Sequence, residues 1–309
     1  MSGSPHAAPP PAPPGLVDPN TDPLPDPVPL HDGIGRVWRA VEYAAPIGYR
    51  PLLLDLYTPN DADTAPVVVF LHGGGWRVGT RRVFCPTWRA WRPDPFYRLV
   101  AEGFTVASVD YRLTGEAVFP AQLHDAKDAV RWLRIRADEL GIATDPITAW
   151  GESAGGHLAA LLGLTTGRTD LDAVAAVVDW YGPSDLLSMQ SQARADAVTN
   201  SDAPDSRESM LIGAPVQEAP VLAREASPMT HVHPGAPPFH LAHGEVDRFI
   251  PAAQSRELAD ALRASGVHVE LEIIPDADHM WVGAPDPERI FQAAVDFVRS
   301  VATDDRPKD

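Results

Sequence analysis

The amino-acid sequence predicts an α/β fold, in which a mostly parallel central sheet carries helices on both faces. First, short apolar runs rich in β-branched residues, such as residues 66–71 (PVVVFL), are typical of strands buried on both faces. Second, segments with helical apolar spacing alternate with these runs, as in right-handed β-α-β crossovers. Third, the length of 309 residues suits one large domain.

Taken in order, the elements begin with two short strands that we expect to form an antiparallel edge. The buried runs follow, separated by helices. The longest of these helices places Leu123, Ala126, Val130 and Leu133 on one face, and the next is small and apolar throughout. The expected strands are residues 36–43, 52–57, 66–71, 104–110, 147–150, 173–180, 238–242 and 267–274, and the expected helices are residues 120–140, 153–165, 251–264 and 287–301.

The elements define one domain over residues 35–303, between two tails. Residues 1–34 are dominated by proline, which lacks an amide donor, so we expect an extended or draped segment there; residues 304–309 form a second tail. Residues 77–95, rich in Arg and Trp, and residues 184–220, polar and irregular, interrupt the alternation. Loops of this length often cover a site, so we expect them to form a lid or small cap.

Charge and composition exclude several classes of function. The chain has 25 Lys and Arg against 42 Asp and Glu, a net charge of −17, which argues against a nucleic-acid or anionic-membrane partner. Its only cysteine, Cys85, excludes an intrachain disulfide, and no metal-ligand or phosphate-loop motif occurs, so no metal or cofactor is expected. No apolar run is long enough for a membrane span, and no secretory signal pattern precedes Arg36. These features predict a cytoplasmic protein.

The strongest functional motif is the sequence GESAG at residues 151–155, a match to G-x-S-x-G. It follows an expected strand directly and opens an expected helix, which is the context that this motif requires. Glycines on both sides of Ser153 allow a sharp turn that leaves its hydroxyl exposed. Ser153 is therefore the candidate nucleophile.

A second motif, HGGGW at residues 72–76, follows the strand that ends at Leu71. Its three glycines let backbone amides approach a ligand without obstruction from side chains. Amides placed in this way can stabilise a developing oxyanion, at about 3–4 kcal/mol for one donor.

The candidate acid and base follow from chain order, because in this architecture they lie after the serine, each on a loop past a strand. Asp247 follows the expected strand at residues 238–242, and His279 follows the one at residues 267–274. The other histidines fall in strands, helices or irregular segments. The acids that stay open as alternatives to Asp247 are Glu245, Asp276 and Asp278.

With these motifs in place, residues 35–302 resemble α/β-hydrolases, and are similar to carboxylesterases of the hormone-sensitive lipase and BD-FAE-like (feruloyl/acetyl esterase-like) groups. The resemblance rests on an ordered series of motifs, which is more specific than any one of them. The series is HGGGW, DYRL at residues 110–113, GESAGGHLAA at 151–160, HGEVDRFIP at 243–251 and DH at 278–279.

The resemblance implies a serine hydrolase that cleaves short to medium or aromatic acyl esters through an acyl-enzyme. Alternatives on the same machinery are an amidohydrolase of the kynurenine formamidase type and a biosynthetic acyltransferase or cyclase. The expected partner is a small ester, and a homodimer is left open. The implied catalytic residues are Ser153, Asp247 and His279, with oxyanion amides at Gly74, Gly75 and Ala154 and support from His72. The expected pocket residues are Trp76, Trp88, Trp91, Glu152, Tyr181 and Trp281.

Overall fold

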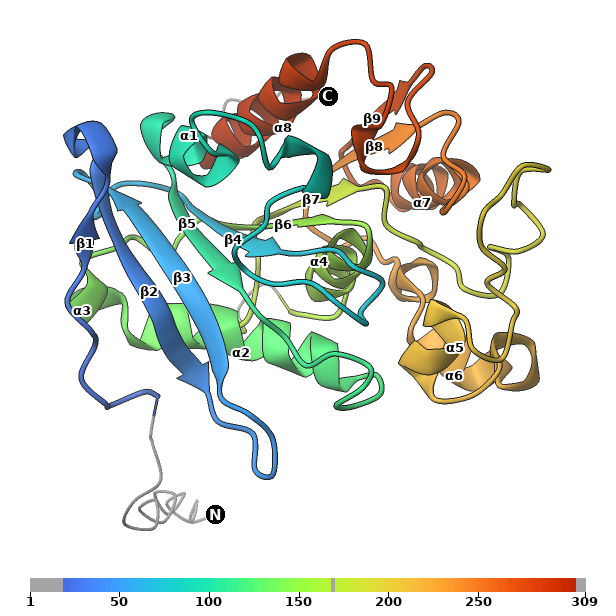
Figure 1. Ribbon diagram of the computed structural model, residues 1–309, viewed down its shortest axis with the longest axis horizontal. Coiled ribbons are helices and arrows are strands. Elements are labelled where there is room, and N and C mark those ends of the chain that lie inside the picture. Colours follow the sequence, from blue (N-terminus) through green and yellow to red (C-terminus); the bar gives the residue numbers. More distant parts are fainter. Residues whose placement is uncertain (1–18, 168–169, 304–309) are drawn as a thin grey trace, which may run out of the picture.

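The computed structural model describes residues 19–167 and 170–303. Within these ranges, nine strands form a single sheet in the order β1-β2-β3-β5-β4-β6-β7-β8-β9 (Figure 1). From β5 to β9 all neighbours are parallel, whereas β1, β2 and β3 form an antiparallel edge. The pairing of β2 with β3 confirms the predicted antiparallel edge, to which the unpredicted β1 is added. The strands are β1 (Val28–Pro29), β2 (Gly35–Ala44), β3 (Leu52–Pro59), β4 (Val67–Leu71), β5 (Thr105–Val109), β6 (Ile147–Glu152), β7 (Ala176–Trp180), β8 (Phe239–Gly244) and β9 (Val269–Ile274).

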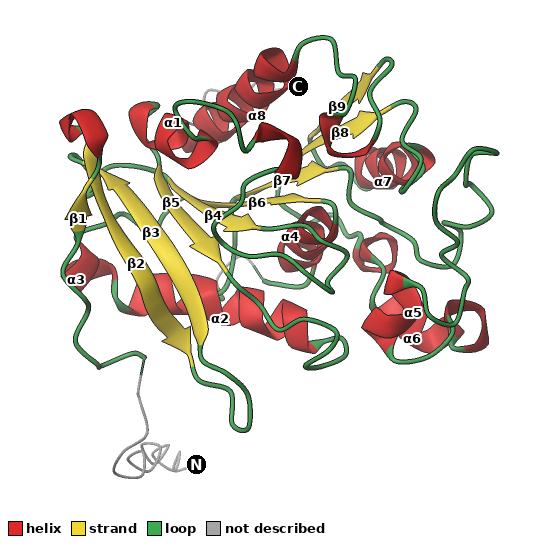
Figure 2. Cartoon of the chain, in the orientation of Figure 1, coloured by secondary structure: helices red, strands yellow, loops and turns green. Residues whose placement is uncertain are grey.

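Helices cover both faces of the sheet (Figure 2), and each face has its own apolar core. Helices α1 and α8 bury Phe96, Leu99 and Ile290 in one core, while α2, α4 and α7 bury Leu133, Leu158 and other apolar residues in the second. The helices are α1 (Pro95–Ala101), α2 (Ala121–Ile135), α3 (Ala137–Leu140), α4 (Ala154–Leu164), α5 (Arg207–Ile212), α6 (Pro220–Glu225), α7 (Ala253–Ala264) and α8 (Pro287–Ala302). Within the described ranges, no helix is long and apolar enough to cross a membrane.

The prediction of one helix over residues 120–140 is wrong, because the backbone leaves helical geometry at Arg136 (φ −98°, ψ 8°) and separates α2 from α3. The buried guanidinium of Arg136 donates to the carbonyl oxygens of Pro19 and Asp22, at 2.8 Å each, and so fixes the chain at the break. These bonds tie residues 19–22 of the expected proline-rich tail to the body of the protein. Residues 28–29 of the same expected tail form β1 and pair with β2. Residues 1–18, and the tail at 304–309, lie outside the described residues.

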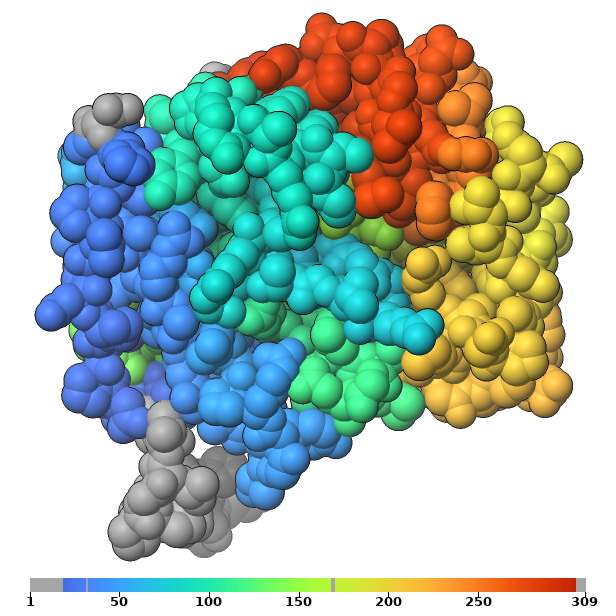
Figure 3. All heavy atoms as spheres, viewed as in Figure 1, coloured from blue at the N-terminus to red at the C-terminus, as the bar shows by residue number. Residues whose placement is uncertain are grey.

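The two irregular segments contain more structure than the sequence indicates. Residues 77–95 include the short 3₁₀-helix η2 (Pro86–Trp88), and residues 184–220 include α5 and a second 3₁₀-helix, η3 (Val216–Glu218). The second segment, with α6, lies at the opposite end of the molecule from the N-terminal strands (Figure 3). Both segments reach the candidate site, as described below.

Candidate active site

Ser153 lies on a sharp turn between β6 and α4, at the carboxyl end of the sheet. Its backbone has φ 55° and ψ −119°, a region that residues with a side chain rarely adopt. The turn packs closely on the end of β4, because a Cβ at Gly155 would lie 1.9 Å from the carbonyl oxygen of Leu71. Only glycine fits at residue 155, which explains the second glycine of the G-x-S-x-G motif.

The structure brings Ser153, His279 and Asp247 together from three loops. Nε2 of His279 lies 3.0 Å from Oγ of Ser153, and Nδ1 of His279 lies 2.7 Å from Oδ2 of Asp247. The loops follow β6, β9 and β8, whose carboxyl ends meet at one edge because β6 to β9 are parallel neighbours. All three residues are less than a tenth exposed. This geometry allows proton transfer between serine and histidine, with the carboxylate orienting the ring.

The Asp247 carboxylate is buried and held in its ionised form. Burial alone would raise its pKa, but the positive charge available on His279 and hydrogen bonds from His243 and His279 hold the pKa well below its usual range. Its second oxygen, Oδ1, accepts hydrogen bonds from the backbone amides of Phe249 (2.7 Å) and Ile250 (2.9 Å). Asp247 is therefore oriented before any substrate binds.

The three alternative acids lie elsewhere. Glu245 and Asp276 are exposed to solvent. Asp278 instead joins the two loops, because it accepts hydrogen bonds from the amides of Arg248 (2.9 Å) and His279 (2.7 Å) and forms an ion pair with the Arg248 side chain. The Asp278 carboxylate thus holds the position of the His279 loop relative to the Asp247 loop.

The glycine-rich loop after β4 lies beside Ser153. Gly74 (φ 115°) and Gly75 (φ 61°) line the same cavity as Ser153 and Ala154. The backbone amides of Gly74 and Gly75 donate no hydrogen bond to the part of the chain that the structure describes. Ala154 is the first residue of α4, where an amide has no partner within the helix. Three amides are thus available to a ligand at Ser153.

The start of this loop is fixed by an aromatic stack. His72 is buried, stacks on Tyr111 with ring centroids 4.4 Å apart, and its Nδ1 donates to the carbonyl oxygen of Gly73 at 2.8 Å. The hydroxyl of Tyr111 donates to the carbonyl oxygen of His72 at 2.7 Å. Burial lowers the pKa of His72, which keeps the ring neutral. His72 therefore supports the loop and does not reach the serine.

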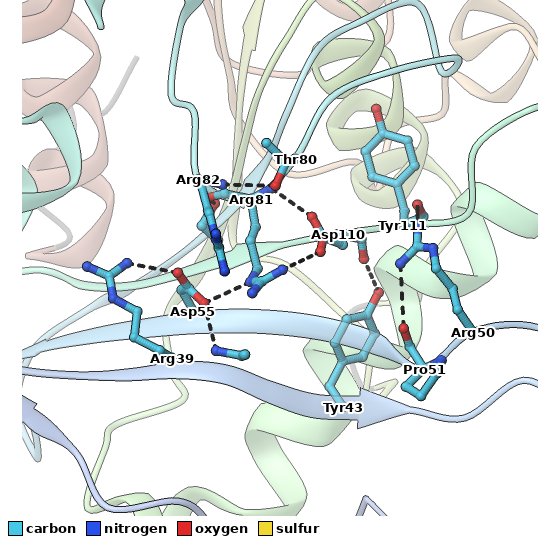
Figure 4. Close-up of polar contacts among 12 residues, drawn as sticks. Arg39, Tyr43, Arg50, Pro51, Asp55, Thr80, Arg81, Arg82, Asp110 and Tyr111 are labelled. Atoms are coloured by element: carbon cyan, nitrogen blue, oxygen red, sulfur yellow. Dashed lines mark hydrogen bonds and ion pairs between the residues drawn. The ribbon is translucent and has the colours of Figure 1, made fainter. Parts of the chain in front are cut away.

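The end of the loop is fixed by a buried ionic network around Arg81 (Figure 4). The Arg81 guanidinium donates to Asp55 at 2.7 Å and to Asp110 at 2.6 Å, and its backbone amide donates to Asp110 at 2.7 Å. On the other side, Arg39 donates to Asp55 at 2.8 Å. The loop is thus held at both ends, and the network also joins β2, β3 and β5.

The cavity at Ser153 is small, with a volume of about 150 Å³. Pockets for drug-sized ligands are typically about 300–1,000 Å³, so this cavity suits a small group. Its lining comes from the loops after four strands and from both irregular segments. The lining residues are Gly74, Gly75, Trp76, Val78, Pro86, Glu152, Ser153, Ala154, Thr199, Arg207, Glu208, Phe249, Ile250, His279 and Met280.

Of the six predicted pocket residues, only Trp76 and Glu152 line this cavity. The prediction is wrong for Trp88, Trp91, Tyr181 and Trp281, which pack in or against the apolar core between the sheet and helices α1 and α8. Trp88 and Trp91 stack on each other with ring centroids 4.2 Å apart. Burying such large rings among other aromatic residues gains more free energy than leaving them partly exposed in a small cavity.

The glutamate of the G-x-S-x-G motif is fully enclosed beside the cavity. Oε1 of Glu152 accepts a hydrogen bond from the Gly73 amide at 2.8 Å. Burial raises the pKa of Glu152 to about 7, although His279, the Gly73 amide and the Tyr181 hydroxyl act in the opposite direction. Glu152 thus joins the serine turn to the glycine-rich loop.

Several lining residues were not predicted. Phe249 and Met280 follow Asp247 and His279 closely in the chain, and the Phe249 ring stacks on His279 at 5.1 Å. Proximity in sequence to the predicted acid and base is a signal that could have found them. Thr199, Arg207 and Glu208 come from the polar segment at residues 184–220, in which no pattern distinguishes them.

Arg207 contacts the glycine-rich loop directly. A Cβ at Gly75 would lie 2.0 Å from Cδ of Arg207, so the arginine side chain crosses the bare backbone of the glycine. The hydroxyl of Thr199 donates to the carbonyl oxygen of Phe249 at 3.1 Å, which ties the same segment to the Asp247 loop. Residues 184–220 therefore form a wall of the cavity.

Comparison with known proteins agrees with this geometry. Residues 54–262 match the family described as BD-FAE. Esterase LipC from Mycobacterium tuberculosis is 34% identical over 239 residues, which are 74% of this chain and 56% of LipC. The chain thus spans little more than half the length of that relative.

Two solved structures are similar over most of their lengths. A truncated form of a carbohydrate esterase from gut microbiota has a TM-score of 0.75 and 27% identity, over 89% of this chain and 99% of that one. Est2 from the Planctomycetes species Thermogutta terrifontis, with butyrate bound, has a TM-score of 0.65 and 25% identity, over 89% of this chain and 97% of that one. These neighbours and the sheet topology show an α/β-hydrolase fold. Because the family match covers well over half of its residues, the chain belongs to the BD-FAE family.

Proposed function

We propose that the protein is a serine carboxylesterase that hydrolyses esters of short acyl groups through an acyl-enzyme. The observation that carries the proposal is the continuous series of contacts from Ser153 Oγ through the His279 ring to Asp247, at 3.0 and 2.7 Å. The esterase names of the relatives support the same class of reaction.

In the first step, Nε2 of His279 takes the proton from the Ser153 hydroxyl while Oγ attacks the ester carbonyl carbon. The negative charge that develops on the carbonyl oxygen is stabilised by the amides of Gly74, Gly75 and Ala154. Asp247 stabilises the imidazolium that forms and keeps Nδ1 protonated. The alcohol then leaves with the proton from Nε2.

In the second step, His279 activates a water molecule, which attacks the acyl-enzyme on the same face. The tetrahedral intermediate uses the same three amides, and the acid leaves when Ser153 recovers its proton. The volume of the cavity, about 150 Å³, favours acyl groups of about the size of butyrate. The butyrate bound to Est2 agrees with this size class.

Hydrolysis of p-nitrophenyl acetate, butyrate and octanoate tests the proposal. Ser153→Ala is expected to lower kcat by at least about 10³-fold. Ser300→Ala, at a partly exposed position of α8 that does not line the cavity, is a matched control that keeps it. The ratio kcat/KM is expected to fall at least about tenfold from butyrate to octanoate, because the longer chain does not fit the cavity. Full activity of Ser153→Ala would contradict the mechanism, and a preference for octanoate would contradict the substrate class.

The cytoplasmic location and the homodimer stay predictions. Light scattering coupled to gel filtration measures the oligomeric state directly.

A further inference from the structure

A second hollow, of about 480 Å³, lies next to the catalytic cavity but is distinct from it. The two share η2 as a wall, since Pro86 lines the cavity whereas Cys85 and Trp88 line the hollow. Its floor is aromatic, with Tyr57 stacked on Phe96 at 5.3 Å. Its residues come from the arginine-rich segment, β2, β3 and α1, and they are Arg39, Tyr57, Arg82, Val83, Phe84, Cys85, Trp88, Arg89, Arg92, Asp94, Pro95, Phe96 and Tyr97.

The hollow is strongly cationic in a chain whose net charge is −17. Four arginines line it against one acid, Asp94. Across the described residues, Arg82, Arg89 and Arg92 form no direct ion pair. Asp94 accepts a hydrogen bond from the Phe96 amide at 2.9 Å and interacts electrostatically with Arg92 and Arg39. Guanidinium groups that outnumber the nearby carboxylates repel one another, and this repulsion is relieved when an anion binds between them.

The fourth arginine is preorganised. Nη1 of Arg39 donates to Asp55 at 2.8 Å and to the hydroxyl oxygen of Tyr57 at 2.6 Å, and its guanidinium lies over the Tyr57 ring. Figure 4 shows Arg39 bonded to Asp55, at the edge of the buried network. The Arg39 side chain is 44% exposed, so its other nitrogen atoms stay accessible. Nη1 of Arg92 is also held, since it donates to the carbonyl oxygens of Arg89 at 2.9 Å and Trp91 at 2.7 Å. Two held cations, and two whose guanidinium groups form no hydrogen bond within the described residues (Arg82 and Arg89), therefore line one hollow.

From these observations we propose that the hollow is a binding site for a small organic polyanion, which the arginines hold by its phosphoryl or carboxylate oxygens. Guanidinium groups match both kinds of oxygen through paired N–H donors. The aromatic floor suits the apolar or ring part of such a molecule. This site is separate from the ester-cleaving machinery, and its test does not depend on turnover.

Isothermal titration of the full chain with pyrophosphate and with citrate, at constant ionic strength, tests the proposal. Binding of either probe is expected to weaken at least tenfold in the double variant Arg82→Gln/Arg89→Gln. The control is Arg256→Gln/Arg263→Gln on α7, which removes the same charge from exposed positions and is expected to change binding less than twofold. Both variants should keep the melting temperature, because the substituted side chains are exposed.

The outcomes separate the ligand classes. Binding of pyrophosphate alone identifies a phosphoryl site, and binding of citrate alone identifies a carboxylate site. Binding of both probes identifies a general polyanion site. The proposal is overturned if neither probe binds at about 1 mM, or if the two double variants weaken binding equally. The first result would mean that the hollow takes no anion, and the second that the probes respond only to overall charge.

Discussion

Ser153 combines a short contact to His279 with a backbone conformation that is unfavourable for a side-chain-bearing residue. A φ of 55° with ψ −119° is readily adopted only by glycine, and strain of this kind costs about 1–3 kcal/mol. The surrounding structure holds the turn, since the Ser153 amide donates to the carbonyl oxygen of Trp180 at 2.8 Å. The hydroxyl is thus presented to the cavity at the expense of stability.

We therefore expect Ser153→Gly to raise the free energy of unfolding by about 1 kcal/mol, while Ser153→Ala leaves it nearly unchanged. Glycine relieves the strain and alanine does not, yet both variants lose the nucleophile. Urea unfolding of the three proteins at one pH measures the difference. Equal stability of the Gly and Ala variants would show that the turn is not strained.

The buried carboxyl of Glu152 should make the free energy of unfolding depend on pH. Its pKa rises from 4.5 to about 7 on folding because the carboxyl is buried, so the folded state binds this proton more tightly than the unfolded state. Stability from this group is present at low pH and is lost as pH rises from 4.5 to about 7. Glutamine does not titrate, so Glu152→Gln does not lose this stability. The difference in free energy of unfolding between Glu152→Gln and the native protein should therefore shift by about 2 kcal/mol in favour of the variant from pH 5 to pH 8. A stability difference that is the same at both pH values would contradict the buried, proton-retaining carboxyl.

The glycine-rich loop depends on what holds its ends. At one end, His72 and Tyr111 fix the chain as it leaves β4, and at the other Arg81 joins the loop to Asp55 and Asp110. A flexible triple-glycine segment presents its amides in one arrangement only because both ends are fixed. The catalytic contribution of such amides rests on this preorganisation.

Arg81→Met is expected to destabilise the protein by about 3–5 kcal/mol, because it leaves the buried carboxylate of Asp110 without its cation and Asp55 with Arg39 alone. It should also lower kcat, since the end of the loop is released. Arg82→Gln is the matched control, because Arg82 is next to Arg81 in the chain but its side chain is exposed. The free energy of unfolding of this variant is expected to change by no more than about 0.5 kcal/mol. Chemical denaturation and ester hydrolysis measure both effects. A loss below about 1 kcal/mol for Arg81→Met would show that the network does not support the loop.

The contact between Gly75 and Arg207 predicts a coupling between the loop and the inserted segment. A Cβ at residue 75 meets the Arg207 side chain, so Gly75→Ala should displace the amide and lower kcat/KM about 10²-fold. In Gly75→Ala/Arg207→Ala the obstruction is removed, and part of the activity should return. The double-mutant cycle is expected to give a coupling of about 1 kcal/mol in kcat/KM, and additive effects would rule out the contact.

For the molecule as a whole, the sequence alone could predict the elements of the sheet to within a few residues. Apolar runs such as residues 66–71 and 147–150 correspond to β4 and β6, because strands buried on both faces leave a continuous hydrophobic pattern. The order of Ser153, Asp247 and His279 along the chain, each after such a run, was enough to place them at one edge. The two-residue strand β1 was missed because it is too short for any period.

The lining of the cavity could not be predicted in the same way. Trp88 and Trp91 occur in an irregular segment, where no period indicates which way a ring points, and both turned toward the core. Arg207 and Thr199 reach the cavity only through the path of residues 184–220, which depends on tertiary contacts. Motifs that fix backbone geometry were informative, whereas composition of loops was not.

The central claim is that His279, oriented by Asp247, activates Ser153 as a nucleophile. An Est2 structure is phosphorylated by paraoxon, so this reagent provides a direct probe. Peptide mapping by mass spectrometry after paraoxon treatment should find one diethylphosphoryl adduct, on Ser153, and His279→Ala should slow its formation by at least about 10³-fold. An adduct on another residue, or unchanged labelling of Ser153 in the His279→Ala variant, would contradict the account.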